Sequence, residues 1–384
     1  MKRRHPFDFD TPVDRLGASS SKWEKYRGRD VIPMWVADMD FRTAPCIVDM
    51  LKARVDHGIF GYTNPPAELP SAVVAAMHRD YGWNIEADWI VWLPSLVVGL
   101  NLVARAFADE GEEILTAIPI YPPFLSAPEY GNRHAVKVSM IESDGLWRWD
   151  MDALEAAVTP KTRVLLLCSP HNPTGRVWTR DELLALAAFC ERHDLVLVSD
   201  EIHAGLVLDE NATHVPAAML DKEIARRTVT LQSASKTFNL PGLGCAFAIV
   251  SDADLRARLR RTMAGIVHHV GALGYFATLA ALRDGRDWQL ALVNYLRSNR
   301  DLVERALETM PGLRTWHVQA TYLSWIDARE LPVSDPAVFF EDAGIGLYQG
   351  ALFGAPGFLR LNFACPRAQL EDSLARVQRA IAAL

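Results

Sequence analysis

The stretch between about residues 90 and 250 constrains the fold most, because short apolar runs alternate there with amphipathic segments. Five runs are typical of buried strands: EEILTAIP, TRVLLLCSP, DLVLVSDE, TVTLQSAS and CAFAIVSD. Between the second and the third lies TRDELLALAAFCERHD, in which Thr179 and Glu182 form a capping box that predicts a helix start. Strands that alternate with helices indicate βαβ units. We therefore expect an α/β fold with a mainly parallel sheet.

The pattern changes near residue 285 to longer helical segments with a few strands. In the last segment, apolar residues recur at helical spacing: Leu370, Leu374, Val377, Ile381 and Leu384. We predict a large domain of residues 46–284. Residues 1–45 and 285–384 are expected to form a smaller α+β domain, with the proline-containing start of the chain as an extended arm and loop.

Composition and charge exclude several classes of partner. The 384 residues carry a net charge of −7, which gives no overall attraction to nucleic acid or to an anionic membrane. No window approaches the run of about 18 apolar residues that spans a bilayer. The basic start MKRRHPFDFD is not followed by the apolar stretch of a signal peptide. A small-molecule partner and a cytoplasmic location are the resulting expectations.

The five cysteines give no metal or disulfide signal. Their number is odd, they are widely spaced and no CxxC pair occurs. These features argue against a disulfide framework and against a zinc site. We expect most of the cysteines to be buried thiols, and we expect no bound metal.

Polar residues gather where predicted strands end. The segments are SPHNPTG, SDEIH, SASK and, much later, LRLNFACP. They place Asn172, then Asp200 28 residues on, Lys236 36 residues further and Arg360 124 residues further. Ligands of open α/β sheets bind at the carboxyl ends of the strands, so we expect these side chains to meet there. Taken singly, each segment has an ordinary alternative, such as a solvated lysine, a helix-capping aspartate or a plain turn.

As a set, these residues resemble the fold-type I pyridoxal-phosphate enzymes, in particular the class I/II aminotransferase superfamily, along essentially the whole chain. Five shorter phrases resemble the cysteine-sulfur lyase branch that includes bacterial cystathionine β-lyases: PMWVADMDF, GYT, IYPPF, SPHNPTGRVW and DEIH. The resemblance implies a seven-stranded, mainly parallel sheet between helices. It also implies pyridoxal 5′-phosphate as the cofactor and a homodimer with shared active sites.

The resemblance assigns the two central catalytic roles to Lys236 and Asp200. Lys236 is expected to join the cofactor aldehyde, since a partly desolvated lysine near cationic groups has a lowered pKa and is nucleophilic. Asp200 is expected to lie against the pyridine nitrogen and keep it protonated, which makes the ring an electron sink.

Four further residues are implied around the ring and the substrate. Asn172 is expected to donate to the 3′ oxygen of the cofactor and to contact the substrate, and Tyr121 to cover the ring face. His203 stands where many relatives have a tyrosine, so its contact stays open, with a buried structural histidine as the alternative. Arg360 is expected to bind the substrate α-carboxylate beside the backbone of Ala37, because its planar fork suits a carboxylate. A structural salt bridge of Arg360 is the alternative.

The cofactor phosphate needs donors, and a helix N-terminus after LPS offers backbone N–H groups. Many aminotransferases carry an arginine eight residues after the lysine, but position 244 is glycine here. We therefore expect mainly neutral donors, with Tyr62 supplied by the partner subunit and also in contact with the substrate; a packed aromatic is the alternative for that tyrosine. The residues expected at the phosphate are Ser95, Leu96, Val97, Ser233, Ser235 and Tyr62.

Two reactions can follow on this common machinery. A β-lyase expels a thiolate from the β-carbon of an amino-acid substrate and yields pyruvate and ammonia, whereas an aminotransferase passes the amino group to a 2-keto acid. The branch phrases favour elimination from cystathionine, other S-substituted cysteines or a related sulfoxide. A regulatory protein that only retains the cofactor is a third interpretation.

Overall fold

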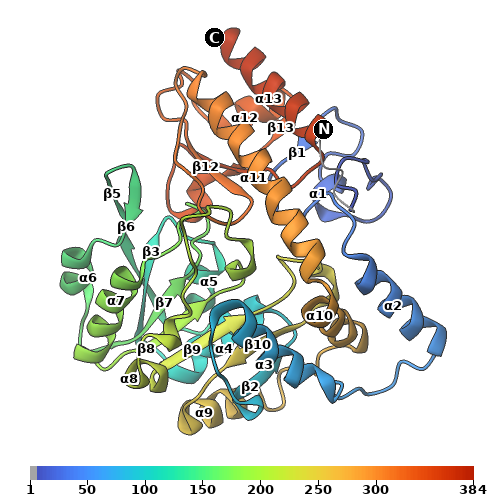
Figure 1. Ribbon diagram of the computed structural model, residues 1–384. Coiled ribbons are helices and arrows are strands. Elements are labelled where there is room, and N and C mark those ends of the chain that lie inside the picture. The colour runs from blue at the N-terminus through green and yellow to red at the C-terminus, as the bar shows by residue number, and fades with distance from the viewer. Residues whose placement is uncertain (1–6) are drawn as a thin grey trace.

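The computed structural model describes residues 7–384, so that the first six residues of the predicted arm lie outside it. Its main feature is a seven-stranded sheet in the order β2-β10-β9-β8-β7-β3-β4 (Figure 1). Strand β10 is antiparallel to β2 and β9, and the other neighbouring strands pair in parallel. The strands are β2 (Ile90–Leu93), β3 (Glu113–Ile118), β4 (His134–Ser139), β7 (Thr162–Cys168), β8 (Val196–Asp200), β9 (Thr228–Gln232) and β10 (Ala246–Ile249). The expected α/β fold with a mainly parallel sheet is confirmed.

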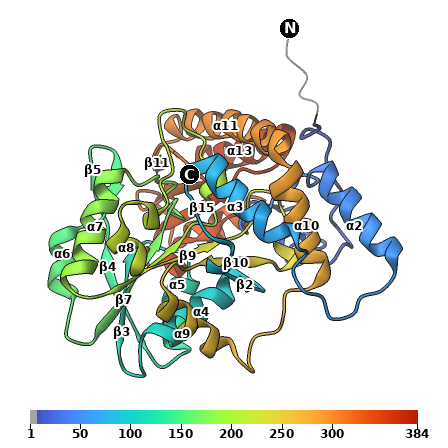
Figure 2. The ribbon, with the colours of Figure 1, turned by 60° about the horizontal axis from the view of Figure 1, so that its bottom comes forward.

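Helices cover both faces of this sheet, which explains why its central strands are buried and mostly apolar. Along β7, Val164 and Leu166 pack toward one group of helices and Leu165 and Leu167 toward the other. Figure 2 shows the two groups apart. The first group is α4 (Leu96–Phe107), α5 (Pro123–Glu129) and α9 (Ala253–Met263), and the second is α6 (Met151–Ala157), α7 (Arg180–Arg192) and α8 (Lys222–Arg226).

The predicted capping box at the start of α7 is confirmed. The Thr179 hydroxyl accepts from the Glu182 backbone N–H at 3.2 Å, and the Glu182 carboxylate accepts from the Thr179 N–H at 2.8 Å. Such a cap stabilises a helix by about 1 kcal/mol. It fixes the crossover between β7 and β8, and both of these strands end at the site described below.

The last hundred residues build a second, antiparallel sheet in the order β11-β12-β15-β14, at the top of Figure 1. A short parallel pair, β1 with β13, attaches the N-terminal segment to this part of the molecule. The strands are β1 (Ile32–Pro33), β11 (Arg314–Thr315), β12 (Leu323–Asp327), β13 (Ile345–Gly346), β14 (Tyr348–Gln349) and β15 (Phe358–Asn362), and the helices are α11 (Arg286–Glu308), α12 (Pro336–Asp342) and α13 (Arg367–Ala382). The domain limits 46–284, 1–45 and 285–384 stay a prediction.

The predicted apolar stripe of the last helix is wrong at its final residue. In α13 the stripe residues up to Ile381 are buried. Leu384, however, lies beyond the end of the helix and is 55% exposed. Helical spacing cannot indicate where the last turn ends.

Helix α2 (Pro45–His57) packs along α10 (Ala272–Asp284) at the edge of the molecule (Figures 1 and 2). The loop that leads from α2 to α3 (Glu68–Tyr81) exposes Ile59, Phe60 and Tyr62. The remaining elements include α1 (Ser21–Glu24) and the hairpin of β5 (Ile141–Ser143) and β6 (Leu146–Arg148). Within residues 7–384, no helix has the length and apolarity needed to cross a membrane.

Candidate active site

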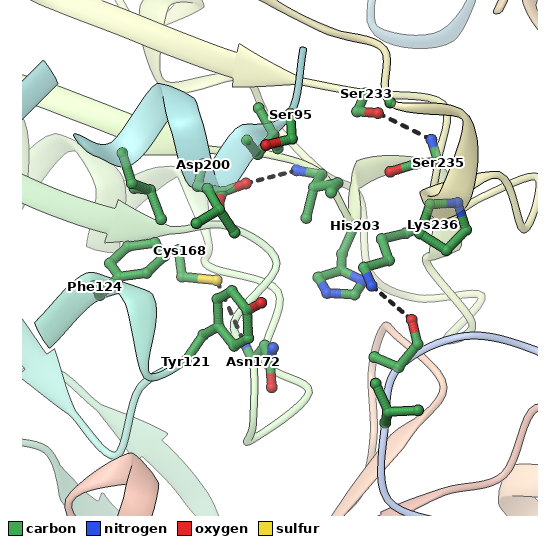
Figure 3. Close-up of a pocket in the computed structure, with 18 of the residues that line it drawn as sticks. Ser95, Tyr121, Phe124, Cys168, Asn172, Asp200, His203, Ser233, Ser235 and Lys236 are labelled. Carbon is green, nitrogen blue, oxygen red and sulfur yellow. Dashed lines mark hydrogen bonds between the residues drawn. The ribbon is translucent and has the colours of Figure 1, made fainter. Parts of the chain in front are cut away.

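A cavity of about 260 Å³ lies at the carboxyl ends of the central strands (Figure 3). It collects residues from segments that are far apart in the sequence. The predicted site residues that line it are Ala37, Ser95, Leu96, Val97, Tyr121, Asn172, Asp200, His203, Ser233, Ser235, Lys236 and Arg360. Tyr62 is not among its lining residues, and its side chain is fully exposed on the loop between α2 and α3.

Asp200 ends β8 and is buried at the base of the cavity. One carboxylate oxygen accepts from the Ile202 backbone N–H at 3.1 Å, a bond drawn in Figure 3. Across residues 7–384, no cationic side chain lies within ion-pair distance of this carboxylate. Desolvation raises the pKa of Asp200 to about 7. A buried carboxylate without a counter-ion fits a ligand that brings a positive charge.

Lys236 lies in the turn after β9, with its amine inside the cavity. The amine donates to the Ala37 carbonyl at 2.6 Å (Figure 3). Desolvation and, after it, the positive charge of Arg360 lower the pKa of Lys236 to about 8. About a tenth of the amine is therefore unprotonated at pH 7, far more than for an ordinary lysine, and attack on an aldehyde requires this neutral form.

Arg360 lies in the middle of β15 and is 1% exposed. Its guanidinium donates to the Asn172 side-chain oxygen at 3.0 Å and to the Trp35 carbonyl at 2.9 Å. The rings of Tyr348 and Phe353 lie 4.9 Å from its central carbon. Desolvation lowers the pKa of Arg360 to about 10.

The buried charge of Arg360 has no carboxylate partner within the described chain, and its Nε has no acceptor there. The alternative of a structural salt bridge therefore finds no support among residues 7–384. Burying a guanidinium without a counter-ion costs free energy unless a ligand of opposite charge binds to it. The arrangement fits a ligand carboxylate that accepts from the guanidinium fork.

The comparisons with known proteins identify the family. The model of the family "aminotransferase class I and II" matches residues 29–377. This chain belongs to that family. Cystathionine beta-lyase PatB of Bacillus subtilis is 35% identical, with 97% of this chain and all of PatB covered.

Two solved structures extend the comparison. The crystal structure of OvoB is 42% identical with a TM-score of 0.96, covering 98% of this chain and all of that one. Cystalysin from Treponema denticola, whose crystal structure contains a pyridoxal 5′-phosphate cofactor, is 31% identical with a TM-score of 0.94 and covers 98% and 99%. The expected superfamily and its cysteine-sulfur lyase branch are thereby confirmed.

The start of α4 lines the cavity of this class I and II family member. Ser95 caps the helix, because its hydroxyl oxygen accepts from the Val98 N–H at 3.2 Å. The first N–H groups of a helix have no acceptor within it, and Leu96 and Val97 line the cavity. Oriented N–H groups at the positive end of a helix dipole suit a phosphate.

The two serines of SASK differ in what they can donate. The Ser233 hydroxyl donates to the Cys245 carbonyl at 2.7 Å and accepts from the Ser235 N–H at 3.1 Å. Its only proton is therefore engaged within the protein, which disfavours the expected donation by Ser233 to a phosphate. The Ser235 hydroxyl keeps its proton available to a ligand.

Gly244 occupies the position at which many members of the family carry an arginine. Its φ of +56° is left-handed, and an added Cβ would lie 3.1 Å from the Pro94 carbonyl oxygen. A side chain at this position would therefore be strained and crowded. The local backbone therefore disfavours an arginine at position 244.

Asn172, Tyr121 and His203 line the cavity beside Lys236 (Figure 3). Because the Asn172 oxygen accepts from Arg360, its amide N–H groups remain free to donate to a ligand. Desolvation lowers the pKa of the buried His203 well below its usual value, so its ring is neutral. Within the described residues, the Nδ1 atom of His203 has no partner. No group of three His, Cys, Asp or Glu side chains in this part of the chain is arranged to hold a metal ion.

Sequence reasoning missed several residues that shape the cavity. Tyr348 and Cys168 line it, and the Asn362 amide donates to the carbonyls of Val36 and Asp38 at 2.6 and 2.7 Å. Alternation along a strand places Arg360 and Asn362 on one face of β15. The segment LRLN therefore contained a signal for Asn362.

Proposed function

We propose that this chain is a pyridoxal-phosphate-dependent cysteine-sulfur β-lyase, which converts cystathionine or another S-substituted cysteine into a thiol, pyruvate and ammonia. One observation carries the proposal: a single cavity combines the Lys236 amine with two buried charges, Asp200 and Arg360, that have no counter-ion within residues 7–384. The family match and the name of PatB support it.

The residues present fit pyridoxal phosphate at each of its functional groups. Lys236 would hold the aldehyde, Asp200 the protonated pyridine nitrogen, and the N-terminus of α4 the phosphate. When bound, this cofactor withdraws electrons from the α-carbon of an attached amino acid. Tyr121, which lines the same cavity, would pack on the ring.

The chain itself orients the substrate and moves the proton. Arg360 would bind the α-carboxylate through two parallel N–H donors, which fixes the position of the α-carbon. The Lys236 amine, with its pKa near 8, takes the α-proton as a general base. A thiolate then leaves the β-carbon of the substrate. Hydrolysis of the remaining unsaturated amino acid yields pyruvate and ammonia and completes the β-lyase reaction.

An assay without any keto acid tests the reaction type. The purified protein is incubated with an S-alkyl cysteine, and pyruvate and thiol are measured over many turnovers. Continuous release of both products supports the lyase. A single half-turnover that leaves the cofactor in its amine form would instead identify an aminotransferase. A yellow protein without turnover on a broad amino-acid panel would favour a regulatory role.

Arg360→Lys is expected to raise KM for an S-alkyl cysteine about 10- to 100-fold with a smaller change in kcat. Lysine keeps the charge but lacks the planar fork, and a hydrogen bond to a charged group contributes about 1.5–3 kcal/mol. Arg329→Lys is a matched control, because Arg329 also lies over an aromatic ring but is 61% exposed in its side chain and pairs with Asp327. An unchanged KM for Arg360→Lys would contradict the assigned role.

We further propose a homodimer in which Tyr62 of the partner subunit completes the phosphate site. The full exposure of Tyr62, between the exposed Phe60 and the start of α3, supports this arrangement. Exposed aromatic side chains grouped on one loop are typical of protein interfaces.

Mixed dimers test the shared site. Lys236→Ala and Tyr62→Ala subunits are each expected to be poorly active alone. A mixture that exchanges subunits should regain activity, because a mixed dimer has one site with both defects and one site with neither. No gain on mixing, despite verified subunit exchange, would place Tyr62 in its own subunit's site or in no site.

A further inference from the structure

Side chains from distant parts of the chain hold the irregular segment 35–39 through its carbonyl groups, in addition to the Met39 N–H, which donates to Asn239 Oδ1, and the Asp38 carboxylate, which pairs with Arg15. Each of its five consecutive carbonyls accepts at least one hydrogen bond from a side chain elsewhere in the chain. A buried carbonyl requires such a donor. The donors are Arg360 for Trp35, Asn362 for Val36, Lys236 and Tyr322 for Ala37, Asn362 and Lys22 for Asp38, and Asn239 and Arg15 for Met39.

The Ala37 carbonyl is the member of this set that contacts the proposed catalytic amine. Lys236 Nζ donates to it at 2.6 Å and the Tyr322 hydroxyl at 3.0 Å. A carbonyl oxygen has two lone pairs, so the two donors together saturate it. Tyr322 is 1% exposed and does not line the cavity.

The backbone before Tyr322 is hydrogen-bonded to two distant segments of the chain. Thr321 has a φ of +76°, which is left-handed and unusual for a β-branched residue. The Thr321 N–H donates to the Leu206 carbonyl at 2.9 Å, and the Ala320 N–H donates to the Gly175 carbonyl at 2.9 Å. Strained backbone of this kind is retained chiefly at functional sites.

We propose that Tyr322 is a positioning residue that keeps the Ala37 carbonyl hydrogen-bonded whenever Lys236 leaves it. The inference rests on the proposed function, in which Lys236 joins an aldehyde and transfers a proton. A lysine joined to an aldehyde carbon keeps at most one N–H. Without the Tyr322 hydroxyl, the buried Ala37 carbonyl would then have no donor. The free-energy penalty of an unsatisfied buried carbonyl exceeds the net stabilisation that a typical hydrogen bond provides.

Tyr322→Phe is expected to affect the cofactor-bound protein and to leave the cofactor-free protein nearly unchanged. The Kd for pyridoxal phosphate is expected to rise about 5- to 100-fold, since only the bound state leaves Ala37 without a donor. The thermal midpoint of the cofactor-free protein should change little, because Lys236 still donates there. Tyr275→Phe is the matched control: it removes another buried tyrosine hydroxyl, one that contacts the Val270 backbone N–H, and should leave the Kd unchanged.

A double-mutant comparison in cofactor-free protein provides an independent readout. In the Lys236→Ala background the Tyr322 hydroxyl is the last donor to Ala37, so Tyr322→Phe should lower the thermal midpoint more than it does with Lys236 present. The proposal would be overturned if Tyr322→Phe lowered the thermal midpoint equally with Lys236 and with Lys236→Ala. It would also be overturned if the Kd of Tyr322→Phe for pyridoxal phosphate stayed within twofold of that of the parent protein. If the parent protein takes up no pyridoxal phosphate, the proposed function fails, while the double-mutant comparison still tests the shared carbonyl.

Discussion

Lys236→Ala is expected to remove the visible absorbance of the covalently held cofactor and to lower kcat/KM for an S-alkyl cysteine by at least about 10⁴-fold. General base catalysis alone contributes about 10²–10⁴-fold, and the covalent attachment point is lost in addition. Absorbance spectra and steady-state kinetics measure the two effects. The effect should be the largest of any single substitution in the cavity, because one amine serves both steps.

Lys161→Ala is the control for this substitution, since Lys161 is exposed and does not line the cavity. It should keep the absorbance and the turnover of the parent protein. If Lys236→Ala instead retained both, another amine would have to hold the cofactor, and the assignment of the site would be wrong.

Asp200→Asn is expected to stabilise the cofactor-free protein at pH 8 while it abolishes most activity. The pKa of Asp200 is raised from 3.8 to about 7 by desolvation. Between these values the folded protein binds more protons than the unfolded chain, so stability falls as the pH rises from about 4 to 7. Asparagine carries no charge to bury, which predicts a gain of about 2–4 kcal/mol at pH 8 that disappears below about pH 4.

Urea unfolding of cofactor-free protein at pH 4 and pH 8 measures this gain. The exposed Asp109→Asn serves as the control and should change stability by less than about 0.5 kcal/mol at both values. A loss of stability at pH 8 in Asp200→Asn, or turnover close to that of the parent protein, would contradict the assignment of Asp200 as an unpaired buried carboxylate that binds a cationic ligand.

The sheet and its crossover helix could be predicted from the sequence because their signals are local. Strand β7 is apolar on both faces, which is typical of a parallel strand between two helical layers. The capping box of Thr179 and Glu182 is contained within four residues. The convergence of Asn172, Asp200 and Lys236 followed from a general property of parallel sheets, since all three come at or just after the carboxyl ends of strands.

The contacts that could not be predicted depend on backbone atoms or on distant packing. The Ala37 carbonyl carries no side-chain signal, and its donor Tyr322 is 285 residues away. The sequence does not indicate that Ser233 donates to Cys245 rather than to a ligand, because that contact depends on the pairing of β9 with β10. The role proposed for Tyr62 would depend on a second chain, which no single-chain pattern describes.

Borohydride reduction of the purified protein, followed by peptide mass analysis, tests the central assignment most directly. We expect the peptide that contains Lys236 to carry the reduced cofactor, and the corresponding peptide of Lys236→Ala to carry none. A protein that takes up no pyridoxal phosphate, or a label found on another lysine in place of Lys236, would contradict the account.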